Sequence, residues 1–190
     1  MNKLIRELDI PFTPNLDLVK YHDISMDNST RKHFLINVDK RDEDVVRFLY
    51  LEGLRVNHSE MFYTPPYNQR NIHIDGNVGQ KPYREIFKIN WIYGAPDSTM
   101  KWYDVKSGYE PDKSKTPAGT YAYLFDEDKC DLLFETSINR PAIVQAGLPH
   151  TVNNNTNQRR WCVSYQIDNL DINVPITWNS IVLKLGKYFI

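Results

Sequence analysis

The chain has little cysteine, almost no net charge and no long apolar run, and each of these absences excludes a class of protein. Its 190 residues contain two cysteines, Cys130 and Cys162, too few for a disulfide framework, so we expect a reducing, cytoplasmic location. A formal net charge of -1 gives no general attraction to nucleic acid or to an anionic membrane. No long apolar segment follows Met1, and we therefore expect neither a signal peptide nor a membrane span.

What is present is the composition of a folded domain rich in aromatic residues. The hydrophobic share of 41% and the charged share of 25% are ordinary for a globular protein, and 190 residues most simply form one domain with its own core. Aromatic residues make up 13% of the chain, which suits pleated strands. We therefore expect a single domain over residues 1–190.

Short runs of alternating apolar and polar residues recur between turn signals. The expected strands are residues 60–63, 71–75, 85–93, 100–105, 120–125, 132–135, 142–145, 151–153 and 160–167. Strands that are so many and so short predict a mainly β fold, either a barrel or a double-sheet jelly roll of the double-stranded β-helix and cupin kind, with one or a few flanking helices.

Three regions are expected around these strands. Residues 1–59 contribute strands and a helix that pack on the outside, residues 60–167 form the core that carries the candidate site, and residues 168–190 form a C-terminal extension ending in a strand or short helix. Within the core, residues 108–119 are rich in Lys, Asp, Pro and Ser, which predicts a mobile surface loop.

The clearest helix is expected over residues 43–52. Apolar residues such as Phe48 and Leu49 recur there at helical spacing, and Asp39 or Asp42 is expected to cap its N-terminus. The apolar stripe of this helix should pack against the outside of a sheet.

A candidate metal site begins at residues 71–76, a strand that runs into a turn. Side chains alternate along a strand, so His73 and Asp75 point to the same side and supply two ligands to one small cation. The best third ligand is His150, which opens another strand-like run. Two histidines and one carboxylate are the facial triad of non-haem Fe(II) oxygenases, which leaves metal positions open for substrates.

The expected strand 160–167 has one polar and one apolar face. Alternation puts four residues on the polar face: Arg160, Cys162, Ser164 and Gln166. The bulky residues between them should pack against a helix, and the polar face should line a solvated cavity. Arg160, rather than Arg159, should therefore lie beside the metal.

Together these residues resemble a known family. His73-x-Asp75, a distant His150, and Arg160 ten residues later resemble the signature of 2-oxoglutarate- and Fe(II)-dependent oxygenases. Within this family the chain is most similar to small single-domain members found in bacteria and their phages. We therefore expect it to act in the cytoplasm, which for a phage protein is that of the host cell. The resemblance spans residues 60–167.

The resemblance implies an oxidoreductase with Fe(II) as metal and with 2-oxoglutarate and O2 as cosubstrates. The three metal ligands would be the catalytic residues, and the products would include succinate and CO2. Arg160 would bind the 5-carboxylate of 2-oxoglutarate, because its planar fork bonds a carboxylate through two nitrogens. Ser164 would add a hydroxyl bond to that carboxylate, and Asn90 would bond the other end of the cosubstrate.

Two other functions remain open on the same residues. The first is a cupin-type metalloprotein in which Arg160 binds an anion other than 2-oxoglutarate. The second is a catalytically silent jelly roll with a binding or structural role, in which His73 and Asp75 are an ordinary hydrogen-bonded pair.

The partners are less defined than the site. A small-molecule cosubstrate is expected, but no motif selects the primary substrate among amino acids, protein side chains, nucleobases and metabolites. The remaining histidines, His22, His33 and His58, show no carboxylate partner in register and are expected to be surface or structural residues.

Overall fold

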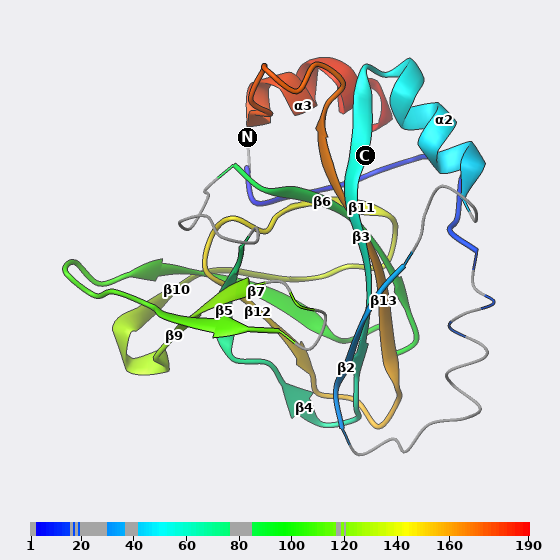
Figure 1. Ribbon diagram of the computed structural model, residues 1–190. Helices are drawn as coiled ribbons and strands as arrows, with labels where there is room; N and C mark the ends of the chain where they lie inside the picture. The colour runs from blue at the N-terminus through cyan, green and yellow to red at the C-terminus, as the bar shows by residue number, and fades with distance from the viewer. Residues whose placement is uncertain are drawn as a thin grey trace.

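In the part of the chain that the structure describes, two antiparallel β-sheets face each other, and helices α2 (Glu43–Leu51) and α3 (Trp178–Leu185) lie on one side of the pair (Figure 1). The computed structural model describes residues 3–15, 17, 19, 30–36, 42–76, 85–116, 119 and 121–190.

The first sheet has six strands in the order β1-β11-β6-β13-β3-β2. Their bounds are β1 Ile5–Glu7, β2 Lys32–Leu35, β3 Leu54–Thr64, β6 Phe87–Tyr93, β11 Ala142–Gln145 and β13 Arg160–Asn169. The longest pairing joins β13 to β3 and carries a register shift between Gln166 and Ile167.

The second sheet has seven strands, six of them in the order β10-β7-β12-β5-β9-β8, while β4 pairs with β12. Their bounds are β4 Asn68–Gln69, β5 Ile72–Gly76, β7 Thr99–Val105, β8 Asp112–Lys115, β9 Tyr121–Phe125, β10 Cys130–Ser137 and β12 His150–Asn154.

The order in which the chain visits the two sheets defines the fold class. From β5 to β6 to β7, and again from β10 through β11 and β12 to β13, each connection crosses from one sheet to the other. This alternation is that of a double-stranded β-helix, or jelly roll, as predicted. All nine expected strands are present; the bounds of eight shift by at most two residues, and β3 begins six residues earlier than expected.

Strand β13 separates the helical side of the molecule from the space between the sheets. Trp161, Val163 and Tyr165 on one face join the largest hydrophobic cluster, together with residues of both helices such as Leu49 and Ile181. Because side chains alternate along the strand, its intervening polar residues face the other sheet. The prediction that the apolar face packs against a helix is confirmed.

The helices are α2 Glu43–Leu51 and α3 Trp178–Leu185, with short 3-10 turns at η1 Glu127–Lys129 and η2 Gly186–Tyr188. The expected helix over residues 43–52 is thus confirmed, and the C-terminal segment forms a helix rather than a strand. No helix among the described residues is long and apolar enough to cross a membrane.

The predicted cap of α2 is only partly correct. Asp42 occupies the N-cap position, but its side chain makes no capping hydrogen bond. Its carboxylate instead accepts hydrogen bonds from the Tyr165 hydroxyl and the Asn15 backbone N–H. Asp39, the alternative cap, lies outside the described residues.

The prediction of a mobile surface loop over residues 108–119 is wrong in its centre. Residues 112–115 form β8, which pairs with β9 at the edge of the second sheet. The segment is polar because an edge strand faces solvent, and lysines commonly protect such an edge from pairing with other chains. Lys113 lies over the ring of Tyr121, 4.2 Å from its centroid.

The hydrogen bond between Tyr165 and Asp42 should stabilise the contact between β13 and the start of α2. We expect Tyr165→Phe to lower the free energy of unfolding by about 1.5 kcal/mol, the low end for a hydrogen bond to a charged group. Urea denaturation measures this change. Tyr93→Phe is the matched control, since the buried Tyr93 hydroxyl has no hydrogen-bond partner among the described residues; an equal loss in both variants would contradict the prediction.

Candidate active site

Three side chains from two neighbouring strands of the second sheet meet at one point. His73 on β5 lies directly opposite His150 on β12, and their ring centroids are 4.4 Å apart. Asp75 follows two residues later on the same face of β5, with its Oδ1 3.6 Å from His73 Nε2. The potential ligand atoms of all three residues lie within 4.8 Å of one another. The structure thus brings together the three residues that the sequence predicts as metal ligands.

Both imidazoles are held in the form that binds metals. Nδ1 of His73 lies 2.8 Å from the carbonyl oxygen of Asn71, and Nδ1 of His150 lies 2.8 Å from that of Leu148. Because a carbonyl only accepts, each Nδ1 carries the proton and each Nε2 keeps its lone pair. Burial and the neighbouring His150 lower the pKa of His73 to about 3, and burial also lowers the pKa of His150. Both rings are therefore neutral near pH 7.

The carboxylate of Asp75 is oriented by a buried lysine. Lys88 Nζ lies 2.8 Å from Asp75 Oδ2 and 2.5 Å from Glu60 Oε2. Burial alone would raise the pKa of Asp75, but the positive charge of Lys88 holds it below its usual value. Burial would likewise lower the pKa of Lys88, but Asp75 and Glu60 raise it. With Oδ2 bound to Lys88, the other oxygen of Asp75 faces the histidines, which suits a carboxylate that binds a metal through one oxygen.

These donors fit a divalent transition metal. Two neutral imidazole nitrogens and one carboxylate oxygen are the ligands that such ions take in facial sites, and a hydrogen bond or ion pair outside the cluster orients each ligand.

The predicted cosubstrate residues line the same cavity as these ligands. Arg160 is only 3% exposed, and its Nε donates a hydrogen bond of 3.0 Å to Ser98 Oγ. Ser164 and Asn90 are cross-strand neighbours, and the Ser164 hydroxyl donates to Asn90 Oδ1 at 2.6 Å. Arg159 is absent from the cavity lining, as strand alternation predicts.

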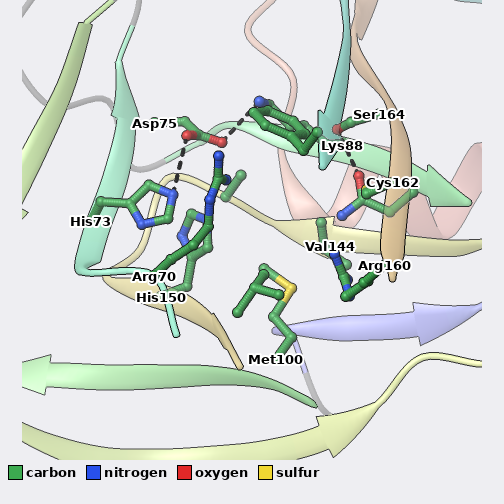
Figure 2. Close-up of a pocket in the computed structure, with 14 residues that line it drawn as sticks. Arg70, His73, Asp75, Lys88, Met100, Val144, His150, Arg160, Cys162 and Ser164 are labelled. Carbon is green, nitrogen blue, oxygen red and sulfur yellow. Dashed lines mark hydrogen bonds and ion pairs between the residues drawn. The ribbon is translucent and has the colours of Figure 1, made fainter. Parts of the chain in front are cut away.

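The cavity lies between the two sheets and has charged groups at both ends. Figure 2 shows His73, Asp75 and His150 on one side and Arg160 on the other. Its volume is about 30 Å³, enough for about two water molecules.

Two cations of this cavity were not predicted from the sequence. Lys88 lies two residues before Asn90 on β6 and shares its face, so alternation along this strand, counted from Asn90, could have pointed to Lys88. Arg70 lies between β4 and β5, outside any regular strand, and no sequence signal marks it.

The expectation for two other histidines needs correction. His33 Nε2 lies 2.8 Å and His58 Nε2 3.2 Å from Glu60 Oε1, so both have a carboxylate neighbour. For His33 the neighbour is invisible in sequence because only the pairing of β2 with β3 brings the two residues together. His22 lies outside the described residues.

No family model and no curated protein matches this chain, but its structure is similar to several solved structures. The chain is similar to an oxalate oxidase in complex with the substrate analogue glycolate, at 12% identity and a TM-score of 0.38, over 85% of this chain and 69% of that chain. It is similar to EvdO2 from Micromonospora carbonacea var. aurantiaca at 10% identity and a TM-score of 0.40, over 78% and 71%. It is also similar to Peruvianin-I, a cysteine peptidase from Thevetia peruviana latex, at 9% identity and a TM-score of 0.37, over 91% and 95%.

The fold and the clustered side chains therefore define a double-stranded β-helix protein with a candidate metal centre. The similarity to solved structures assigns no role to any residue of that centre.

The lowered pKa values of His73 and His150 predict that acid destabilises the metal-free protein. Below about pH 6.5 the unfolded chain binds protons at these histidines while the folded protein does not, so stability is lost as pH falls. We expect a slope of up to about 1.4 kcal/mol per pH unit for each histidine. Urea denaturation between about pH 7 and pH 5 measures it. His73→Gln should flatten the slope, and an unchanged slope would contradict this origin.

Proposed function

We propose that this protein is a non-haem Fe(II)- and 2-oxoglutarate-dependent dioxygenase that hydroxylates its substrate. In the overall reaction a C–H bond, O2 and 2-oxoglutarate become C–OH, succinate and CO2. The observation that carries the proposal is that the cluster of His73, Asp75 and His150 shares one narrow cavity with the buried guanidinium of Arg160.

His73, Asp75 and His150 would hold Fe(II), which supplies the reactivity toward O2 that protein side chains lack. Their arrangement supports this role. The two Nε2 lone pairs and Asp75 Oδ1 converge, while hydrogen bonds to Asn71 and Leu148 prevent the rings from turning away.

Arg160 would bind the 5-carboxylate of 2-oxoglutarate. It is the most deeply buried arginine of the cavity, and its contact with Ser98 engages only Nε, so the guanidinium has further N–H groups to donate. A carboxylate paired with a guanidinium in a confined site forms a strong, directional contact. Ser164 and Asn90, bonded to each other in the same wall, would orient the cosubstrate.

Binding of 2-oxoglutarate requires the cavity to widen, because a five-carbon diacid is larger than about two water molecules. Arg70 and Met100 line the cavity and have several rotatable bonds, so their movement is the simplest way to admit it. The strands that carry the metal ligands need not move.

The metal ligands can be tested one at a time. His73→Ala, Asp75→Ala and His150→Ala should each abolish succinate formation and weaken Fe(II) or Mn(II) binding at least about tenfold, since two ligands remain in place of three. Calorimetric titration measures the binding, and circular dichroism checks that the fold survives. Asp128→Ala, which removes an exposed carboxylate outside the cavity lining, is the control. Full activity of Asp75→Ala would remove the carboxylate from the site.

Arg160 separates this proposal from a metalloprotein that does not use 2-oxoglutarate. Removing one partner of a confined charged pair costs about 2–5 kcal/mol. We therefore expect Arg160→Ala to weaken 2-oxoglutarate binding to the Mn(II) protein by more than about tenfold and to change metal affinity little. Arg159→Ala is the matched control. An effect of Arg159 alone would shift the anchoring role to it, and no effect of either would reject 2-oxoglutarate as the cosubstrate.

A further inference from the structure

Arg70 is the one cation of the cavity whose role the proposed reaction does not explain. Its backbone is tied to β12, the strand of His150. The Arg70 N–H donates to the Val152 carbonyl at 2.9 Å, and the Arg70 carbonyl accepts from the Thr151 hydroxyl. These bonds fix where the side chain starts, beside the metal ligands.

The guanidinium of Arg70 lies over the ring of Phe62, with 4.6 Å from Cζ to the ring centroid. Both residues line the cavity. No hydrogen bond or ion pair joins this guanidinium to another residue in the described part of the chain. Stacking on an aromatic ring leaves the edge of a guanidinium, with its N–H donors, free to bond a carboxylate or phosphate.

The three cations of the cavity differ in partners and in depth. Lys88 is buried between two carboxylates, those of Asp75 and Glu60, and is therefore neutralised. Arg160 is almost fully buried, whereas Arg70 is half-buried and so lies nearer to solvent. Figure 2 shows Arg70 beside the histidines, across the cavity from Arg160.

With metal and 2-oxoglutarate bound, the formal charges in the cavity would sum to zero without Arg70. A divalent metal, Asp75 and the dianionic cosubstrate sum to -1, and Arg160 brings the sum to zero. Lys88 and Glu60 cancel each other. The charge of Arg70 then remains, next to the metal and on the more open side. Arg70 is partly buried, and Asp75, the carboxylate whose charge acts most strongly on it, would be engaged by the metal, so one more anionic group would complete the charge balance of the site.

We propose that Arg70 binds a carboxylate or phosphate group of the primary substrate, which is a small anionic metabolite; this rests on the proposed function. Binding there places the anionic group beside the metal ligands and directs a neighbouring C–H bond toward the metal. Neutral analogues of the same shape would leave the guanidinium unpaired and bind more weakly.

The test uses pairs of related probes, one anionic and one neutral. N-acetyl amino acids are compared with their primary amides, and nucleoside 5′-monophosphates with their nucleosides, so that the two arms distinguish carboxylate from phosphate. Binding of each probe to the protein saturated with Mn(II) and 2-oxoglutarate is measured by calorimetry. We expect the charged member of at least one pair to bind at least about tenfold more tightly, the low end for a hydrogen bond to a charged group.

Variants of Arg70 then test whether this residue causes the preference for charged probes. Arg70→Gln should reduce the ratio of the two affinities to near one, Arg70→Lys should keep part of it, and Arg140→Gln, which removes an exposed arginine, should keep all of it. Equal binding of both members in the wild type, no binding of any probe at millimolar concentration, or an unchanged ratio in Arg70→Gln would overturn the assignment. Failure of the wild-type protein to bind 2-oxoglutarate is a separate result and rejects the proposed function itself.

Discussion

The ion pairs of Lys88 connect the two sheets at the point on which the candidate site depends. Lys88 lies on β6 and Glu60 on β3, both in the first sheet, whereas Asp75 lies on β5 in the second. Removing one partner of such a buried group leaves a charge without compensation, at a cost of about 3–5 kcal/mol. The same contact fixes which oxygen of Asp75 faces the histidines. One buried lysine thus couples the joining of the sheets to the geometry of the metal ligands.

Alternation along the strands explains how a mostly apolar fold contains a polar cavity. On β13, Arg160, Cys162 and Ser164 line the cavity, whereas the residues between them join the core that packs on the helices. On β6, Lys88 and Asn90 face inward to the cavity while Ile89 and Trp91 join the core. Burying these charges costs less free energy because Lys88 pairs with two carboxylates and Arg160 donates a hydrogen bond to Ser98. Arg70 stacks on Phe62 beside the metal ligands, and the anionic substrate group proposed above would supply the charge that faces it.

Much of the fold and about half of the charged residues of the site could be predicted from the sequence. The strands are marked by alternation and turn residues, and the ligand pair His73 and Asp75 is marked by its spacing. The edge strand β8 was mistaken for a loop because both of its faces are polar, so alternation leaves no trace in it. Asp42 occupies the N-cap of α2 as expected but makes no capping hydrogen bond, because its carboxylate is engaged by Tyr165, more than a hundred residues away.

Local pattern alone therefore determined nine of the thirteen described strands, the face on which their side chains lie, and the residue types suited to metal binding. Those properties depend on neighbours within a few positions, and a sequence displays them directly. Only the tertiary structure decided that His73 lies opposite His150, that Lys88 joins Asp75 to Glu60, and that Arg70 reaches into the cavity. These contacts follow from strand order and register, which are set by the packing of whole sheets rather than by any short segment.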